Sequence, residues 1–538
     1  MRKFFKILMF FPLSLGSAAL LASCDTTEET RVLRILNCED YIYEHADGDE
    51  DEMEPPEDEN WYKMDVIKQF EKYMEKQGVE VTCVYDTFDT NETMFNELQT
   101  GKTSYDVIVP SDYMIQKLIS NNMLHKISDK NRAGIWENIS PYLVNKFDEI
   151  KAEYDGVEHA LSEYSVPYMW GTVGMMYNPS FYVEESGGSL NEEQVHELFM
   201  DWNSLYTNEY IKGTYSIKDS VRDTYAVSLI HAYRDEIASL SEKQIEDGVL
   251  GDIFNRNSEQ EMAFVKEDML KLKEAAFGFE CDSGKTDMVD GKVGANMCWS
   301  GDATWAITEA GDGENPKDLY YAIPTSYNGE ELKGASNIWF DGLCMPRNTD
   351  HEDNLSEEEQ AQYDLAEEFI KFISTPEIAA QNCYCVGYTP GVAGEAMFDY
   401  MLDCYDISDD LTEDSVLGED YVEYDLTYFF QGSLSDEYLA ELELDNDYIC
   451  IYADPDTARK ELAAQYPEQS ILDRLAVMKD FGKEGNTRLL DMWEQVRTNS
   501  LPLWAIIVFA IEGAGAIAFA LYLIMHKVYR KRNKKARV

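Results

Sequence analysis

Strand-like and helix-like stretches alternate along the chain between Arg31 and Asn122. Runs rich in β-branched residues are each followed by an amphipathic stretch with helical periodicity. The stretches are 32–37, 64–77, 79–88, 91–99, 105–110 and 112–122. Because parallel strands need a crossover that is usually a helix, this order predicts a parallel α/β sheet. Ligands of such sheets bind at the carboxyl ends of the strands, which here are 37–41, 85–91 and 111–113.

A second set of strands and helices follows from about Val166. We expect strands at 171–177, 213–217, 320–324 and 338–345, and helices at about 259–276, 361–374 and 457–496. The acidic, tyrosine-rich stretch 403–456 shows little periodicity. With 538 residues, the chain is long enough to bury more than one core, so two or three domains are expected.

The segment 291–307 combines an apolar run with a helix start. Trp299 ends the apolar run, and Ser300, Gly301 and Asp302 suit a sharp turn and a helix N-terminus. An indole face beside a carboxylate attracts an organic ammonium. The quadrupole of the ring attracts the cation, and the carboxylate accepts hydrogen bonds from its N–H groups. A core tryptophan next to an N-capping aspartate is the alternative interpretation.

The charge of the chain excludes one class of partner. The formal net charge is −58, and all 103 Asp and Glu residues lie between residues 24 and 525. Such a chain repels phosphate backbones, so we expect no nucleic-acid binding. Within the run 47–59 the acidic residues lack the spacing of a calcium loop, and the cysteines form no CxxC pair, so no metal site and no cofactor are expected.

Both ends of the chain carry membrane signals. Residues 1–24 have a basic start, an apolar core and the sequence LASC, which is typical of a lipoprotein signal acylated at Cys24. The apolar segment 501–525 is long enough to span a bilayer as a transmembrane helix, and the basic tail 526–538 marks the cytoplasmic side. We therefore expect an exported domain held at the cell membrane, with the binding domain on its extracytoplasmic face.

Eight motifs of the chain, taken together and in order, resemble those of the spermidine/putrescine-binding components of ABC transporters. They are NCEDY (37–41), TNETMFNELQTG (90–101), YDVIVPSDYM (105–114), VPYMWGTVGMMYN (166–178), DSVRDTY (219–225), CWSGDA (298–303), IWFDGLCMP (338–346) and VGYTP (386–390). The resemblance implies a two-lobed α/β clamp of the periplasmic-binding-protein type II kind. Lobe 1 would comprise 31–168 and about 303–350, and lobe 2 would comprise 169–302 and about 351–498.

The same resemblance implies a polyamine ligand, ABC permease subunits as partners and no catalysis. The implied ligand-binding residues are Glu39, Asp40, Tyr41, Ser111, Asp112, Tyr113, Trp170, Asp219, Ser220, Asp223, Trp299, Asp302, Trp339 and Asp341. Carboxylates and aromatic rings also suit a polyamine on chemical grounds, because its ends are cationic and its middle is apolar.

The chain departs from the family pattern at two positions of this set. Cys38 stands where an aromatic residue is common, and Asp112 where a neutral hydroxyl residue is common. Two alternatives remain open from the residues alone. One is a secreted hydrolase that uses two carboxylates, and the other is a receptor of the same fold for a metal or another cation.

Overall fold

The computed structural model describes residues 30–44, 65–101, 103–280, 283–312, 316–348, 354–412 and 414–498. The predicted signal segment 1–24, the acidic run 47–59, the apolar span 501–525 and the tail 526–538 lie outside these ranges. In the ranges that are described, no helix combines the length and the apolar character needed to cross a membrane.

A parallel sheet forms the core of the first lobe, as the alternating pattern predicts. Strand β1 (Arg31–Cys38) lies between β2 (Val81–Phe88) and β3 (Val107–Ile108), and both pairings are parallel. The helices that follow these strands are α1 (Val66–Lys76), α2 (Asn91–Thr100) and α3 (Asp112–Ser120). The carboxyl ends of the three strands therefore meet at one edge of the sheet, and the loops that carry residues 39–41, 89–90 and 111 lie together there.

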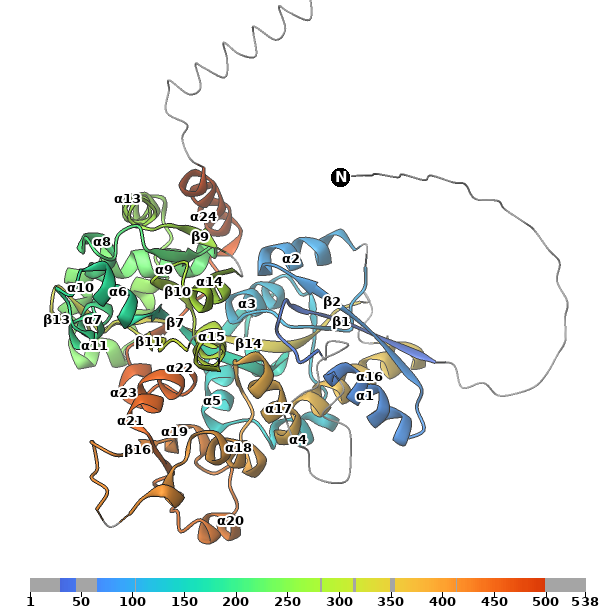
Figure 1. The fold of residues 1–538 in the computed structure, drawn as a ribbon. Helices are drawn as coiled ribbons and strands as arrows, with labels where there is room; N and C mark the ends of the chain where they lie inside the picture. The colour runs from blue at the N-terminus through green and yellow to red at the C-terminus, as the bar shows by residue number, and fades with distance from the viewer. Residues whose placement is uncertain are drawn as a thin grey trace, which may run out of the picture.

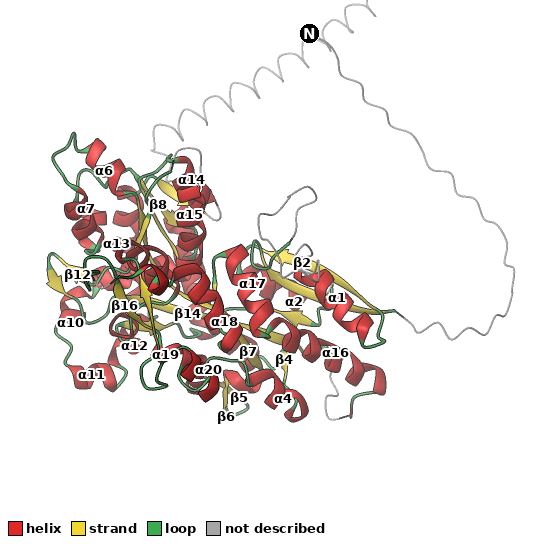
Figure 2. Ribbon diagram, turned by 60° about the horizontal axis from the view of Figure 1, so that its bottom comes forward, coloured by secondary structure: helices red, strands yellow, loops and turns green. Residues whose placement is uncertain are grey.

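Two long strands run through both lobes. They are β7 (Ser165–Tyr177) and β14 (Ser336–Pro346), which pair antiparallel along most of their length. The continuous sheet has the order β2-β1-β3-β14-β7-β10-β8-β9, so β14 and β7 stand at its centre. Figure 2 shows these strands between the helices of the two lobes. Because both strands belong to both lobes, they form the structural link between them.

The second lobe contains the other end of the sheet. Its strands are β8 (Tyr215–Lys218), β9 (Gly278–Glu280), β10 (Ala295–Trp299) and β11 (Tyr320–Ala322). Its main helices are α9 (Val221–Ala232), α13 (Glu259–Ala275), α14 (Ser283–Asp290) and α15 (Ser300–Asp312). Strand β10 ends at Trp299 and helix α15 begins at Ser300, so the strand-to-helix junction predicted from the sequence is confirmed.

The C-terminal helices return to both lobes. Helix α16 (Glu357–Ile373) contacts α1, α4 and β1, and Figure 1 shows it beside α1 in the first lobe, whereas the sequence placed residues after about 351 in lobe 2. Helix α15 contacts α14 and β10 in the second lobe, whereas the sequence placed 303–350 in lobe 1. The chain therefore crosses between the lobes at other places than the expected lobe boundaries. One reason is that β7 and β14 each pass through both lobes.

The stretch 403–456 and the last helix complete the molecule. Strands β16 (Val422–Asp425) and β17 (Cys450–Ala453) form a hairpin-like pair, with short helices α19 (Thr427–Phe430) and α20 (Asp436–Glu441) between them. Helix α24 (Gly482–Arg497) packs on α13 and α9. Figure 1 shows α24 at the end of the coloured chain, beside β9 and α13.

The remaining elements are short or lie on the periphery. In the first half of the chain they are β4 (Leu124–His125), α4 (Asp129–Trp136), α5 (Pro141–Glu149), β5 (Lys151–Tyr154), β6 (Val157–Ala160), α6 (Pro179–Glu185), α7 (Glu192–Phe199), α8 (Asn203–Thr207), α10 (Arg234–Ala238), α11 (Glu242–Glu246) and α12 (Val249–Phe254). In the second half they are β12 (Ser326–Tyr327), β13 (Glu330–Glu331), α17 (Pro376–Val386), β15 (Thr389–Pro390), α18 (Glu395–Tyr405), α21 (Pro455–Thr457), α22 (Ala463–Gln465), α23 (Gln469–Leu472) and β18 (Leu475–Val477).

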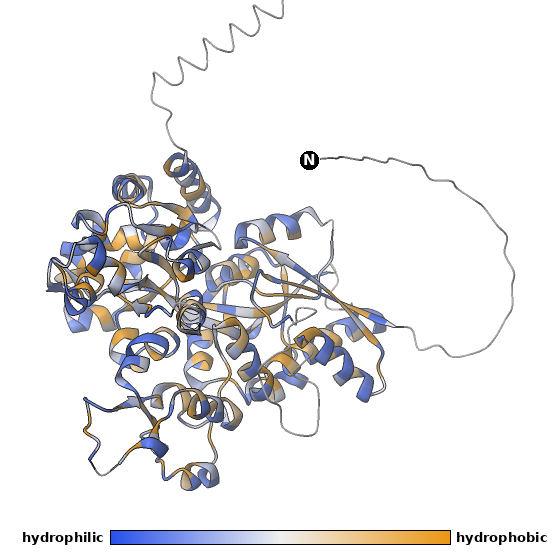
Figure 3. Cartoon of the chain, in the orientation of Figure 1, coloured by the Kyte–Doolittle hydropathy of each residue, from blue (hydrophilic) through white to orange (hydrophobic). Residues whose placement is uncertain are grey.

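The hydrophobic core follows the central sheet. Leu33, Ile108 and Phe340, from three neighbouring strands, are fully buried. A separate cluster joins α24 to the second lobe, where Leu489 and Trp493 pack with residues of α9 and α13. Figure 3 shows hydrophobic colour along the strands and on the inward faces of the helices. Burial of this apolar surface is what holds helix α24 against the second lobe.

Candidate functional site

A cavity with a volume of about 250 Å³ lies between the two lobes. Its walls come from the loops after β1, β2 and β3, from the β8–α9 and β10–α15 junctions, from β14 and from α24. The ligand-binding residues implied by the sequence line this one cavity, with the exception of Trp170. They are Glu39, Asp40, Tyr41, Ser111, Asp112, Tyr113, Asp219, Ser220, Asp223, Trp299, Asp302, Trp339 and Asp341.

Trp170 was expected to bind the ligand, but it does not line this cavity. Its side chain is fully buried and stacks on Phe429 at 6.0 Å between ring centroids. The neighbouring residue on β7, Gly171, faces the other side of the sheet, where a Cβ would lie 2.6 Å from Trp339. Because successive residues of a strand point to opposite faces, only one of these two positions can face the cavity.

Trp299 and Asp223 form one wall of the cavity. The indole Nε1 of Trp299 donates a hydrogen bond of 2.9 Å to Asp223 Oδ2, and Asn337 Nδ2 donates one of 3.3 Å to Asp223 Oδ1. Asp223 lies in the first turn of α9. Burial raises the pKa of Asp223, although hydrogen bonds from Ser220 and Trp299 favour the ionised carboxylate. The pairing fixes the plane of the indole ring, so one ring face is directed at a defined position.

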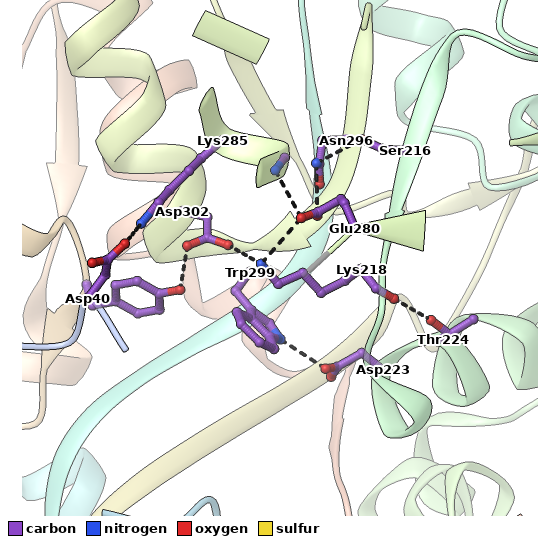
Figure 4. Close-up of polar contacts among 12 residues, drawn as sticks. Asp40, Ser216, Lys218, Asp223, Thr224, Glu280, Lys285, Asn296, Trp299 and Asp302 are labelled. Atoms are coloured by element: carbon purple, nitrogen blue, oxygen red, sulfur yellow. Dashed lines mark hydrogen bonds and ion pairs between the residues drawn. The ribbon is translucent and has the colours of Figure 1, made fainter. Parts of the chain in front are cut away.

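That position is occupied by a lysine of the chain. Lys218 Nζ lies 4.3 Å from the centroid of the Trp299 ring and 2.8 Å from Asp302 Oδ2. Asp302 also accepts a hydrogen bond of 2.7 Å from the hydroxyl of Tyr388. Burial opposes ionisation of Asp302, but the ammonium groups of Lys218 and Lys285 hold its pKa below the usual value. Figure 4 shows Lys218, Trp299 and Asp302 converging, with Glu280 beyond.

Asp341 and Tyr41 meet in another part of the cavity wall. The hydroxyl of Tyr41 donates a hydrogen bond of 2.6 Å to Asp341 Oδ2, while Asp341 Oδ1 is buried and has no hydrogen-bond partner in the described part of the chain. Burial raises the pKa of Asp341 to about 6, although hydrogen bonds from Ser111 and Tyr41 favour its ionised form. Ser111 is itself held by two hydrogen bonds with the side chain of Asn91. A ligand N–H group that reaches Oδ1 of Asp341 would supply the partner that this buried atom lacks among the described residues.

Asp112 and Tyr113 follow Ser111 at the start of α3. Asp112 Oδ2 accepts a hydrogen bond of 3.1 Å from the backbone N–H of Phe340, and its Oδ1 atom is buried with no partner within the described ranges. Burial raises the pKa of Asp112 well above its usual value. The hydroxyl of Tyr113 donates to Glu92 Oε1 at 3.2 Å, and the guanidinium of Arg222 lies 4.7 Å from the Tyr113 ring centroid.

Two carboxylates of the cavity are paired with cations of the chain at its rim. Asp40 lies 3.1 Å from Lys285 Nζ, and Asp219 Oδ2 lies 2.9 Å from the guanidinium of Arg497 at the end of α24. Glu39 is exposed. Arg222 forms its hydrogen bond of 2.5 Å with the backbone oxygen of Lys479, so it stands next to Asp223 without bonding to it.

Aromatic rings line the space between the carboxylates. Tyr388 packs against Tyr41 at 4.8 Å and against Trp339 at 5.9 Å between ring centroids. Trp493 of α24 also lines the cavity. Apolar faces with nearby acceptor oxygens complement a flexible organic cation, because its methylene groups contact the rings while its N–H groups find acceptors.

The residues of this cavity that sequence reasoning missed include two lysines, a tyrosine and an arginine: Lys218, Lys285, Tyr388 and Arg497. Tyr388 belongs to a motif that carried the resemblance, and Lys218 immediately precedes Asp219 at the end of a predicted strand, so both positions had a signal. No sequence signal marked Lys285 and Arg497, because their partners Asp40 and Asp219 are far away in the sequence.

The fold and the site together define a two-lobed solute-binding clamp, in which a sheet shared by both lobes places a polar and aromatic cavity between them. The comparison with protein families agrees. Residues 66–397 match the family described as bacterial extracellular solute-binding protein, and this chain belongs to that family.

Individual relatives are similar over most of their length. The spermidine/putrescine-binding periplasmic protein of Escherichia coli (strain K12) is 25% identical over 341 residues, which cover 63% of this chain and 78% of that protein. The putrescine-binding periplasmic protein SpuD of Pseudomonas aeruginosa (strain UCBPP-PA14) is 25% identical over 393 residues, which cover 73% and 86%. These relatives confirm the family resemblance that the eight motifs indicated.

A solved structure confirms the fold. The putative spermidine/putrescine ABC transporter from Listeria monocytogenes superposes with a TM-score of 0.52 at 22% identity, over 87% of this chain and 99% of that one.

Proposed function

We propose that this chain is an extracytoplasmic receptor for polyamines of the spermidine/putrescine class and delivers its ligand to an ABC permease. The observation that carries the proposal is the cavity between the lobes, in which Asp112, Asp223 and Asp341 lie among the rings of Trp299 and Trp339. The names of the relatives point to the same ligand class.

The unused acceptor atoms support a cationic ligand with N–H donors. Among the residues that the structure describes, Oδ1 of Asp112, Asp219 and Asp341 is in each case buried without a hydrogen-bond partner. Leaving such an atom unsatisfied costs about 1–3 kcal/mol. An ammonium group carries three N–H donors and a full positive charge, so it can donate to such atoms and offsets part of the cost of burying the carboxylates.

The proposed mechanism is closure of the clamp around the ligand. Walls of the cavity come from both lobes, so a ligand that contacts both stabilises the conformation in which they are closest. The permease would recognise that conformation. No bond is made or broken in this cycle, and ATP hydrolysis belongs to other subunits of the transporter.

We further propose that the receptor is held at the cell membrane at both ends. The basis is the sequence of the signal segment with Cys24, of the apolar span 501–525 and of the basic tail 526–538. Helix α24 ends at Arg497, a few residues before the apolar span begins. The cavity that α24 helps to form would therefore be close to the membrane and to the permease in it.

A receptor accounts for the chain better than the secreted hydrolase that the residues alone left open. The family to which the chain belongs is described by solute binding. In addition, two of the cavity carboxylates, Asp302 and Asp219, already form ion pairs with Lys218 and Arg497, which is an arrangement suited to a fixed binding wall.

Isothermal titration calorimetry of the full-length chain in detergent tests the proposal. We expect heat of binding with putrescine or spermidine, and a loss of at least about tenfold in affinity in Asp341→Asn, because a charge-assisted hydrogen bond contributes more than about 1.4 kcal/mol. Asp318→Asn is the matched control, since Asp318 is an exposed aspartate paired with Lys460 outside the cavity. A correctly folded chain that binds neither putrescine, spermidine nor spermine would refute the proposed function.

A further inference from the structure

The junction of Trp299 and Asp302 has the chemistry of an amine-binding site, and a cation of the chain already fills it. Lys218 Nζ is 4.3 Å from the Trp299 ring centroid, 2.8 Å from Asp302 Oδ2 and 4.0 Å from Glu280 Oε2. The side chain of Lys218 is 4% exposed. An ammonium over an indole face and against a carboxylate is how a ligand amine would be held.

Both carboxylate oxygens of Asp302 already accept a hydrogen bond from the chain. Its Oδ2 atom bonds to Lys218, and its Oδ1 atom accepts the hydroxyl hydrogen of Tyr388. A ligand amine brought to this place would also meet the positive charge of Lys218 at short range. Like charges at a buried position repel strongly, because little solvent screens them.

Other carboxylates of the cavity remain available to a ligand. In the described part of the chain, no lysine or arginine forms an ion pair with Asp112 or Asp341, and the Oδ1 atom of each is buried without a hydrogen-bond partner there. Binding of amines is therefore restricted to the part of the cavity away from Lys218.

We infer that Lys218 sets the ligand preference of this receptor by acting as a built-in ammonium in the Trp299–Asp302 subsite, so that the cavity selects a linear diamine over longer polyamines with three or more amines. This inference rests on the proposed function, because it names which members of the ligand class bind. It also assigns Asp302 a new role, since Asp302 holds Lys218 in place and does not bind the ligand.

Calorimetry with putrescine and spermidine on the full-length chain in detergent tests the inference. The wild-type chain is expected to bind putrescine at least about tenfold more tightly than spermidine. Lys218→Met removes the charge and keeps an apolar stem of similar length. In this variant the affinity for spermidine is expected to rise about tenfold, while that for putrescine changes by less than about threefold.

Two further variants separate the subsite from general effects of charge. Lys460→Met is the matched control, because Lys460 is also paired with an aspartate, Asp318, at 2.8 Å and lies 4.9 Å from the ring centroid of Tyr320, but outside the cavity. It should leave both affinities unchanged. The double variant Lys218→Met/Asp302→Asn should lose the gain for spermidine, because the carboxylate that would bind the extra amine is gone.

The outcomes distinguish this inference from the proposed function. A wild-type chain that binds spermidine as tightly as putrescine, or more tightly, overturns the inference without any variant and leaves the proposed function standing. The inference is also overturned if a folded Lys218→Met variant has the same ratio of putrescine to spermidine affinity as the wild type. If Lys218→Met does not fold, Lys218→Arg, which keeps the cation, must preserve the diamine preference. Absence of binding to both ligands would instead refute the proposed function.

Discussion

At the scale of single residues, Asp341 links ligand binding to pH. Burial raises the pKa of Asp341 to about 6, and its buried Oδ1 atom has no hydrogen-bond partner among the described residues. At about pH 7 the group is mostly ionised and attracts an ammonium, whereas at about pH 5 a ligand must first displace a proton. We therefore expect polyamine affinity to fall by up to about tenfold per pH unit below about pH 6.

Calorimetric titrations at about pH 5, 6, 7 and 8 measure this effect. Near pH 6, titrations in two buffers of different ionisation enthalpy should show that ligand binding releases protons. The residual affinity of Asp341→Asn should vary less with pH than that of the wild type. An affinity that stays constant between pH 5 and pH 7 in the wild type would contradict the assignment.

The residues that sequence analysis found share a simple feature, and the ones it missed do not. Tyr41 lies in the loop after β1, Asp112 begins α3 and Asp341 lies on β14, in motifs where the residue types already match an amine ligand. Trp170 was wrongly included. Successive residues of a strand point to opposite faces of the sheet, and the sequence around Trp170 does not show which of the two faces lines the cavity. Lys218 was missed because a binding site for a cationic ligand gives no reason to expect a cationic side chain of the protein inside it.

At the scale of elements, the approach of β7 to β14 and α15 shapes the cavity. A Cβ added to Gly171 of β7 would lie 2.5 Å from Ser300 Oγ and 2.6 Å from Cζ2 of Trp339. Because such contacts are too short, Gly171→Ala must displace the Trp339 ring that lines the cavity. We expect this variant to lose about 1–3 kcal/mol of stability from overpacking and to bind polyamine at least about tenfold more weakly.

Gly251→Ala is the matched control for this substitution. Gly251 lies in helix α12, and an added Cβ there meets no atom within 4 Å. It should therefore keep wild-type affinity and gain up to about 1 kcal/mol, because alanine favours the helix. Chemical denaturation and calorimetry measure the two effects. Equal affinities of the two glycine variants would show that the approach of β7 to Trp339 does not matter for the ligand.

Elements were easier to predict than their assignment to lobes. The parallel strands β1, β2 and β3 follow from local periodicity, and so does the junction of β10 and α15. The return of α16 to the first lobe depends on contacts with α1 and β1 across almost 300 residues of chain. Helical periodicity fixes which face of α16 is apolar, but it does not identify the partner that covers that face.

At the scale of the whole molecule, the net charge of −58 governs how a cationic ligand arrives. A strongly acidic surface raises the local concentration of polyamine and accelerates encounter, and salt screens this field over about 10 Å at 0.1 M ionic strength. We expect the association rate constant for putrescine to fall about tenfold between about 20 mM and about 300 mM NaCl. Stopped-flow tryptophan fluorescence can follow binding, because Trp299 and Trp339 line the cavity.

The dissociation rate should change much less with salt than the association rate, because the ligand leaves from contacts with buried carboxylates such as Asp112 and Asp223. Sucrose at matched osmolality is the control, since it changes water activity without screening charge. Spermidine, with one more positive charge, should show a steeper dependence on salt than putrescine if long-range attraction acts on the whole ligand. An association rate that is independent of NaCl, or a salt effect confined to dissociation, would mean that the acidic surface only keeps the protein soluble and does not guide its ligand.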